Sequence, residues 1–442
     1  MKNQAMFAMA LAALVISPAA GAQVEKFPTG FFGVSPAVAV SADGVIHLVY
    51  AKGGGAGVGY AALSGGAWSA ETVLPDSASA SASIFDRPSI DTDPSSYPHV
   101  VWGSKGTWNG TECTHTPGEV FYWNGATNQV HQIFNEYIEY ISIALNDSGE
   151  KMFGASVIQL PGEVICTRAN THFAAAPFSG DALGDFTRFD TGDLDDKLAS
   201  FCTSQGSTFH LVASFNKVVH VQYAGASWSG IEKIGWPDGP VTIGAPACSA
   251  DGAGTLHLAW LQWEQLGPGD YAMRGIRYAK KVGYDWLPSM EGLVVGALPD
   301  GGVSLPPTIA LDPAGTILVA WLVESELYIS VSFDGGESFT SPEAVLADAQ
   351  GDTNPDQNPP PPVFFAEGHF QVIYKNDISR ELIRGVFMDI EPPPPDQGPE
   401  GADEAVGDAE PRADAPVDGA TDGRADGGTE NGGGCSCRLG SS

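Results

Sequence analysis

Basic residues are scarce in this chain. Its 442 residues include 21 lysines and arginines against 53 aspartates and glutamates, which gives a formal net charge of -32 at pH 7. Binding to nucleic acid or to an anionic membrane requires a basic face that can displace counterions. The composition therefore argues against nucleic acid and against an anionic membrane surface as partners.

Long apolar runs are missing beyond the N-terminus. Residues 5–16 are apolar, follow Lys2 and precede the small residues Ala20-Gly21-Ala22, a pattern typical of a Sec signal peptide cleaved before Gln23. The run is too short for a spanning helix, and no cysteine follows the cleavage site to carry a lipid anchor. We therefore expect a secreted or cell-surface protein whose chain has no transmembrane segment.

Cysteines are also few, six in all. In an exported protein they are expected to pair, because the compartment is oxidising. Cys113 lies in a long loop and Cys166 in an outer strand of the next repeat, which favours a disulfide between them. Cys202 and Cys248 occupy nearly equivalent first-strand positions in successive repeats, and they either pair with each other or remain buried thiols.

Repetition is what the sequence has in abundance. About seven times, a small or proline-initiated apolar strand is followed by a polar turn and a second strand, with a period of about 50 residues, the length of one four-stranded propeller blade. The aligned passages are 36–40 with 47–50, 88–91 with 99–102, 141–144, 199–202 with 210–212, 246–248 with 257–260, 307–310 with 319–321, and 362–365 with 371–374. We predict an all-β fold, a seven-bladed β-propeller of four-stranded antiparallel blades, with six blades as the alternative if the weak third repeat belongs to a loop.

The two ends of the repeat series predict how the ring closes. The last repeat lacks its outermost strand, because residues 382–387 lead almost directly into the four prolines 392–395. Residues 24–27 can supply that strand from the N-terminus, which removes the free edges of an open sheet. From Glu391 onward Pro, Gly, Ala, Asp and Glu dominate, and this composition predicts a disordered acidic tail. The expected organisation is a signal peptide over 1–22, a propeller over 23–390 and a disordered tail over 391–442.

One short motif points to a family. The segment 332–339 fits the Asp box, S-x-D-x-G-x-x-aromatic, of bacterial neuraminidase repeats through Ser332, Asp334, Gly336 and Phe339. Asp334 is expected to accept backbone amides across a hairpin turn and Phe339 to pack between blades. Residues 24–390 thus resemble sialidase-like propellers, in which the Asp box lies at the blade periphery. The resemblance implies a fold and leaves the activity open.

The end of the tail carries a second resemblance. The run Cys435-Ser436-Cys437-Arg438 follows three glycines. It resembles the start of a C-terminal surface-sorting tag of the myxobacterial type, without the apolar helix and arginine cluster of such tags. The resemblance implies surface anchoring, and the alternative is a spacer with two exposed thiols.

The resemblance to sialidases also implies a catalytic set that is incomplete here. A sialidase of this family holds the substrate carboxylate with three arginines and uses a tyrosine nucleophile beside a glutamate, together with an aspartic acid. The early F-R-I-P signature that supplies one arginine is absent, and Val34-Ser35-Pro36 stands in its place. The remaining catalytic candidates are Asp86, Arg87, Glu136, Tyr137 and Arg380.

Ligand-binding candidates are expected on one face of the propeller. The loops that lead into each first strand, and those that join second to third strands, crowd around the axis of a propeller. The carboxylates beside phenols in the segment 136–140 suit glycoside chemistry or sugar stacking, although we favour an ordinary amphipathic strand. The candidates are Glu139, Tyr140, Lys197, Trp263 and Glu264.

Two sets of residues suggest metal ligands. The histidines 47, 99, 210 and 257 repeat at one position on separate blades, so they cannot easily converge on one metal, and we expect them to pack between strands. The carboxylates of Asp190, Asp193, Asp195 and Asp196 suit Ca²⁺, although we favour a solvated acidic loop. No other cofactor is expected.

These features predict an exported, monomeric, non-catalytic propeller that binds a glycan or a surface protein at or near the cell surface. The alternative is a sialidase-like glycoside hydrolase that acts on surface glycans.

Overall fold

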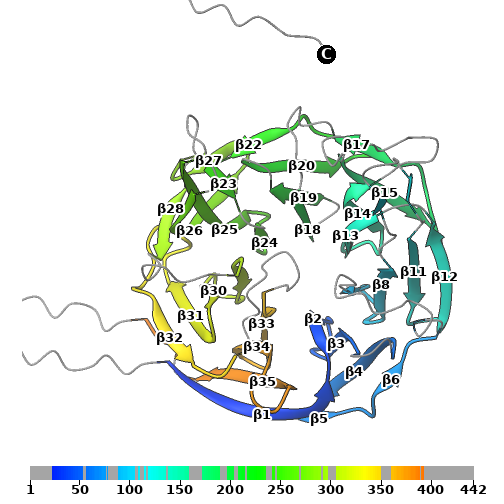
Figure 1. The fold of residues 1–442 in the computed structure, drawn as a ribbon, viewed down its shortest axis with the longest axis horizontal. Helices are drawn as coiled ribbons and strands as arrows, with labels where there is room; N and C mark the ends of the chain where they lie inside the picture. The colour runs from blue at the N-terminus through cyan, green and yellow to red at the C-terminus, as the bar shows by residue number, and fades with distance from the viewer. Residues whose placement is uncertain are drawn as a thin grey trace, which may run out of the picture. The chain divides into compact units, whose positions relative to one another are not determined.

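The computed structural model of the chain contains seven antiparallel blades arranged in a ring, which confirms the predicted propeller (Figure 1). All named secondary-structure elements of the described residues are β-strands. The structure describes residues 22–52, 56–75, 77, 88–104, 108–109, 114–115, 118–135, 138–158, 172–189, 197–203, 208–214, 217–234, 241–243, 246–267, 270–289, 292–296, 305–349, 360–388 and 390–392.

Each of the first three blades is an antiparallel sheet, and in blades 1 and 3 the fourth strand is divided into two short pieces. Blade 1 consists of β2 (Val34–Val40), β3 (Ile46–Ala51), β4 (Val58–Ser64), β5 (Ala67–Trp68) and β6 (Thr72–Val73). Blade 2 consists of β7 (Ser89–Thr92), β8 (Pro98–Ser104), β11 (Glu119–Asn124) and β12 (Gln129–Phe134), with a small hairpin of β9 (Trp108–Asn109) and β10 (Thr114–His115). Blade 3 consists of β13 (Ile138–Leu145), β14 (Lys151–Ile158), β15 (His172–Ser179), β16 (Ala182–Leu183) and β17 (Thr187–Phe189).

The other four blades repeat this plan, and blade 5 has the longest hairpin. Blade 4 consists of β18 (Lys197–Thr203), β19 (Phe209–Ser214), β20 (Val218–Ala224), β21 (Ser227–Trp228) and β22 (Glu232–Ile234). Blade 5 consists of β23 (Val241–Ile243), β24 (Ala247–Ala250), β25 (Leu256–Gly267), β26 (Asp270–Val282), β27 (Asp285–Leu287) and β28 (Leu293–Gly296). Blade 6 consists of β29 (Thr308–Leu311), β30 (Ile317–Val323), β31 (Glu326–Ser332) and β32 (Glu343–Leu346). Blade 7 consists of β33 (Val363–Ala366), β34 (His369–Lys375), β35 (Glu381–Met388) and β1 (Gln23–Phe32).

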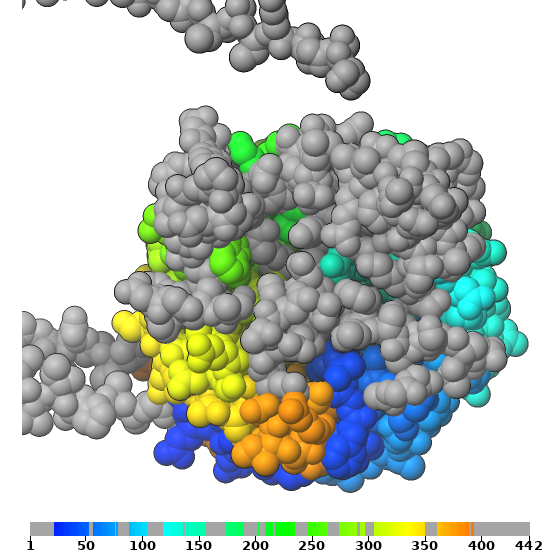
Figure 2. Space-filling model, in the orientation of Figure 1, coloured from blue at the N-terminus to red at the C-terminus, as the bar shows by residue number. Residues whose placement is uncertain are grey.

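The ring closes as the sequence predicts. Strand β1 pairs antiparallel with β35, from Gln23 opposite Met388 to Pro28 opposite Ile383, and becomes the outer strand of blade 7. Figure 2 shows this closure as blue atoms of the N-terminal strand beside orange atoms of the last blade. Because the outer edge of the last blade is occupied by the start of the chain, the ring has no open seam there.

Tight turns join the first and second strands of the blades. In blade 5, the Oδ1 of Asp251 accepts the amides of Ala253 at 2.9 Å and Thr255 at 2.7 Å, and Gly254 takes a φ of +85°. Asp312 accepts the amide of Thr316 at 2.7 Å in the matching turn of blade 6. A short carboxylate that binds its own backbone explains why the repeat places aspartate here.

The innermost strands face the axis and contact one another around the ring (Figure 1). Side chains of β7 reach across to the inner edge of blade 3, where the Oγ of Ser89 accepts the Ile143 amide at 3.2 Å and Asp91 accepts the Leu145 amide at 2.7 Å. Burial raises the pKa of Asp91 to about 6, although the hydrogen bonds from the Leu145 and Thr92 amides act to lower it. Apolar residues fill the spaces between neighbouring blades, so each blade packs mainly against the next.

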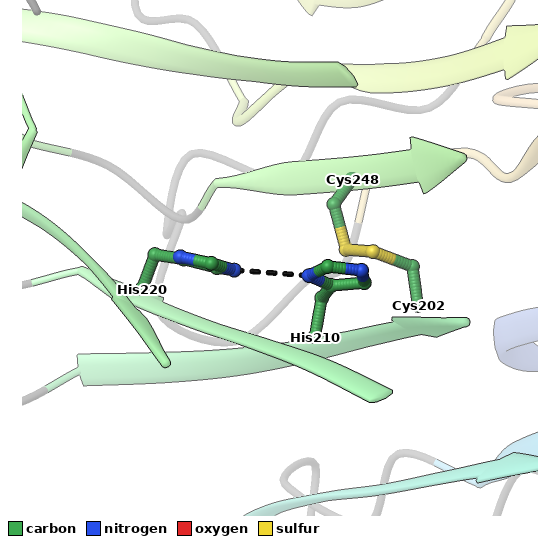
Figure 3. Close-up of a disulfide and its surroundings, with 4 residues drawn as sticks. All are labelled: Cys202, His210, His220 and Cys248. Atoms are coloured by element: carbon green, nitrogen blue, oxygen red, sulfur yellow. Dashed lines mark hydrogen bonds between the residues drawn. A yellow bond between two sulfur atoms is a disulfide. The ribbon is translucent and has the colours of Figure 1, made fainter. Parts of the chain in front are cut away.

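A disulfide joins two neighbouring blades. Cys202 of β18 bonds to Cys248 of β24, with Cα atoms 5.9 Å apart (Figure 3). The alternative of two buried thiols is therefore wrong for this pair. The second predicted pair, Cys113 and Cys166, lies outside the described residues.

Several other predictions concern residues outside the described part of the chain. They are the signal peptide up to residue 21, the tail from residue 393 with Cys435 and Cys437, and the candidate Ca²⁺ ligands Asp190, Asp193, Asp195 and Asp196. Among the described residues, no helix is long and apolar enough to span a membrane.

Candidate functional site

The propeller has two different faces. We call one the long-loop face; it carries the connections from second to third strands, such as 323–326 and 375–381, and those from one blade to the next. The other, the short-turn face, carries the turns from first to second strands, such as 251–255 and 312–316, and those from third to fourth strands. The sequence places its ligand-binding candidates on the long-loop face.

Among the described strands, the hairpin of blade 5 is the longest, and it projects on the long-loop face. Strands β25 and β26 have 12 and 13 residues, whereas β30 and β31 of blade 6 have seven each. The extra strand β23 pairs with the extension, with Thr242 opposite Trp263 and Ile243 opposite Gln262. A hairpin braced by a third strand holds its side chains more firmly than a loop. Trp263 and Glu264, two of the candidates, both lie on this extension.

The indole of Trp263 lies at the boundary between core and solvent. It is half-buried and packs against the apolar cluster between blades 5 and 6, while its neighbour Gln262 is buried. A tryptophan with one face supported by the core can present the remaining surface to a ligand. Sequence reasoning missed β23, for which the β-branched run Val241-Thr242-Ile243 was the available signal.

The other candidates from the strands lie at the long-loop ends of the first strands of blades 3 and 4. Glu139 and Tyr140 belong to β13, where a β-bulge between Glu139 and Ile141 accompanies a φ of +50° at Tyr140. Lys197 begins β18 opposite Ser214, next to another shift in register. Strands β13 and β18 contact each other. Bulges that re-aim the backbone at the rim of a sheet are frequent beside binding sites.

In blade 7, the two described arginines do not converge on one site, as the arginines of a sialidase have to. Arg380 is exposed on the loop from β34 to β35, 3.6 Å from the carboxylate of Asp377. Arg384 is buried: its Nε donates to Gln371 Oε1 at 2.6 Å, and its terminal nitrogen pairs with Glu367. Glu367 belongs to the turn between β33 and β34, on the short-turn face. The two guanidinium groups therefore serve opposite faces.

Four catalytic candidates, Asp86, Arg87, Glu136 and Tyr137, lie outside the described residues. Within the described part of the chain, no group of three His, Cys, Asp or Glu side chains is arranged to hold a metal ion.

The repeated histidines form buried pairs near the short-turn face. In blades 1, 2 and 5 the Nδ1 of the histidine lies at hydrogen-bond distance from a tyrosine hydroxyl of the third strand. These pairs are His47 with Tyr60 at 2.8 Å, His99 with Tyr122 at 2.6 Å and His257 with Tyr278 at 2.7 Å. Burial lowers the pKa of each of these histidines. They are neutral members of the blade interior on separate blades.

Blade 4 has a second histidine in place of the tyrosine. The Nδ1 of His210 lies 3.0 Å from the Nε2 of His220, beside the disulfide (Figure 3). His220 in turn bonds Glu232 at 2.8 Å, and the Nζ of Lys281 from blade 5 donates to the same carboxylate at 2.6 Å. Burial lowers the pKa of His210 to about 3, and the nearby charges of His220 and Lys281 act in the same direction.

The motif 332–339 forms a compact turn between β31 and β32. The Oδ1 of Asp334 accepts the amides of Glu337 and Ser338 at 3.0 Å each, and the Oγ of Ser332 donates to it at 2.7 Å. Burial acts to raise the pKa of Asp334, but the hydrogen bonds outweigh it and hold the pKa at about 2. Phe339 packs edge-to-face on Tyr278 of blade 5, with ring centroids 4.9 Å apart. This turn is on the short-turn face and joins two blades.

Solved structures with the same architecture are similar to this chain at low sequence identity. A polysaccharide lyase, the PL25 ulvan lyase bound to -[GlcA(1-4)Rha3S]-, is 13% identical with a TM-score of 0.55, over 82% of this chain and 96% of that one. Polysaccharide lyase Uly1 is 10% identical with a TM-score of 0.50, over 80% of this chain and 90% of that one. The Hadza microbial sialidase Hz136 is 10% identical with a TM-score of 0.42, over 80% of this chain and 65% of that one.

The shared feature is the propeller fold. No protein-family model matches the sequence, and no curated protein matches it. The likeness to the two lyases supports the propeller architecture alone, and the chemistry must be argued from this chain's own residues.

Proposed function

We propose that the propeller binds a glycan on its long-loop face without transforming it. The observation that carries this proposal is the braced extension of blade 5, which holds the half-buried Trp263 at the boundary between core and solvent. Sugar rings present flat C–H faces that stack on an indole, and a rigid platform lowers the entropy cost of that contact.

Two further observations support a glycan as the ligand. The bulged strand ends that carry Tyr140 and Lys197 lie on the same face as Trp263. The PL25 ulvan lyase, which has the same fold, is described with an oligosaccharide bound. The net charge of -32 favours a neutral glycan over a sulfated or uronate-rich one, because like charges repel.

A glycan array followed by calorimetric titration of the best ligand tests the proposal. Trp263→Ala is expected to weaken binding about tenfold or more, the typical effect of losing one stacking side chain. The matched control is Tyr284→Ala, which removes an aromatic ring that is 94% exposed on the short-turn face of the same blade. Equal glycan affinities of the two variants would show that Trp263 does not contact the ligand. A glycan array in which no glycan binds would contradict the proposal as a whole.

A sialidase-like glycoside hydrolase is the second candidate. The exposed guanidinium of Arg380 on the same face is the observation in its favour. An enzyme of this kind should release aryl alcohols from aryl glycosides, including sialosides, and Arg380→Ala should abolish that release. If Arg380→Ala still hydrolyses these substrates, the catalytic residues must be others. If the natural chain hydrolyses none of a broad panel of glycosides, the hydrolase alternative is excluded and glycan binding remains.

We also propose that the protein is exported and acts at or near the cell surface. The sequence pattern up to Ala22 is the reason. N-terminal sequencing of the mature protein should begin at Gln23, and fractionation should recover the protein outside the cytoplasm. Capture of a surface protein by the Trp263→Ala variant as well as by the natural chain would instead favour a protein partner.

A further inference from the structure

A polar pair fills the same interior position in most blades, near the short-turn face. One member is the second or third residue of the second strand, and the other lies diagonally across on the third strand. The pairs are His47 and Tyr60, His99 and Tyr122, His210 and His220, His257 and Tyr278, and Gln371 and Arg384.

Blade 3 differs at this position. Its turn from Asn146 to Glu150 matches the turn from Asp93 to Tyr97 in blade 2, so Met152 stands where blade 2 has His99. Counting along the paired strands places Ala175 where blade 2 has Tyr122. Blade 3 thus has a methyl group in place of a large ring.

Blade 6 shows that the loss of the polar pair alone does not open a space. The corresponding residues there are Leu318 and Ile329, both buried in an apolar cluster. The large side-chain volume on the third strand is retained in blade 6 and lost in blade 3, because the alanine side chain is much smaller than that of isoleucine or tyrosine.

A pocket of about 280 Å³ lies beside Met152, at the boundary between blades 3 and 4. Its wall includes Glu150 and Pro177 from blade 3 and the aromatic residues Phe209 and Tyr223 from blade 4. The two rings lie 6.4 Å apart between centroids. This volume is close to the lower limit for small-molecule sites, so the pocket suits a single small chemical group.

The charge of the pocket is negative. Glu150 is exposed at the rim, where its Oε2 accepts the Asn146 amide group at 2.6 Å. Lys151 also contributes to the wall, but its ammonium group donates to Tyr122 and to Asp181 at 2.9 Å each. The lysine charge is therefore already neutralised by Asp181, and the carboxylate of Glu150 sets the sign of the site.

We propose that this pocket binds a compact organic cation, such as the trimethylammonium head group of choline. Aromatic side chains attract cations through their π faces, and a nearby carboxylate adds Coulomb attraction. The acidic chain concentrates cations and repels anions at its surface. The pocket is on the short-turn face, so it is separate from the proposed glycan site.

Calorimetric or NMR titration of the full exported chain with choline tests this site, with 3,3-dimethyl-1-butanol as the neutral analogue of the same shape. Choline should bind about fivefold or more tightly than the neutral analogue, and Glu150→Gln should remove most of that preference. Glu25→Gln is the matched control, because it removes one exposed carboxylate from β1 without touching the pocket.

The tyrosine variants test the aromatic contribution. Tyr223→Phe keeps the ring and should retain choline binding, whereas Tyr223→Leu should weaken it about fivefold. If Tyr223→Leu does not fold, Glu150→Gln still decides. No saturable binding up to concentrations on the order of 10 mM would overturn the proposal, as would equal affinities for choline and its neutral analogue.

Discussion

Removing the disulfide between blades 4 and 5 should destabilise the propeller strongly. The bond joins the innermost strands β18 and β24, next to the histidine pair of blade 4 (Figure 3). The change to make is the double variant Cys202→Ala and Cys248→Ala. Both side chains are half-buried, so the loss of two sulfur atoms leaves little empty volume.

The expected size follows from the length of chain that the bond closes. The two cysteines are 46 residues apart in sequence. In the chain-entropy description, a cross-link that closes a loop of that length raises the free energy of the unfolded state by about 4 kcal/mol, because it lowers the conformational entropy of that state. The free energy of unfolding should therefore fall by about 4 kcal/mol at most, with smaller losses if the reduced, unfolded chain retains structure.

Urea unfolding followed by tryptophan fluorescence measures this effect. The natural chain is compared with and without a reductant, and the double variant is measured under both conditions. Because the chain has six cysteines, the effect of reductant on the double variant reports only the remaining ones. The difference between the two chains without reductant isolates the bond between Cys202 and Cys248.

The reasoning is refuted if the double variant loses less than about 1 kcal/mol, since that is the size of an ordinary point substitution. Reduced natural chain and double variant should agree in stability once the effect of the other cysteines is subtracted. A much less stable double variant would mean that sulfur packing, rather than chain entropy, dominates.

Three further changes test other contacts. Gly336→Ala should lower the unfolding free energy by about 2 kcal/mol or more, because the glycine has a φ of +90° and an added Cβ would collide with the Tyr278 hydroxyl; an unchanged melting temperature would contradict this. Burial lowers the pKa of His210 from 6.5 to about 3. Between these two pH values, the imidazole binds a proton in the unfolded chain and stays neutral in the folded one. Stability should fall by up to about 1.4 kcal/mol per unit as pH drops through that window, and less steeply in His210→Gln. Arg384→Met should cost about 1–3 kcal/mol in urea unfolding, because it leaves the buried Oε1 of Gln371 without its hydrogen-bond donor; an unchanged stability would contradict this.

Much of the fold was open to prediction because each blade is a local unit. The alternation of apolar and polar residues along the strands, and turns such as Asp251 to Thr255, are set by residues a few positions apart. Their repetition along the chain led to the prediction of seven blades. The closing role of residues 24–27 was predictable for a different reason: the last repeat lacked a strand that only the N-terminus could supply.

The candidate site was predictable in position and much less in detail. The topology of a propeller sends Tyr140, Lys197 and Trp263 to one face, as expected. The brace of β23 was missed, since three residues carry too weak a pattern. Arg384 is only four residues from Arg380 along the chain, yet it is buried in β35 and pairs with Glu367 at the other face.

By itself, the sequence determined the strands, the turns, the number of blades and the closure of the ring, because these depend on short-range periodicity repeated along the chain. Only the tertiary structure decided which side chains meet between blades: Lys281 with Glu232, Phe339 on Tyr278, and the residues around the pocket beside Met152. Those contacts join residues of separate strands or separate repeats, so they depend on how two sheets stack. The pocket beside Met152 exists only because Phe209 and Tyr223 of blade 4 pack next to blade 3.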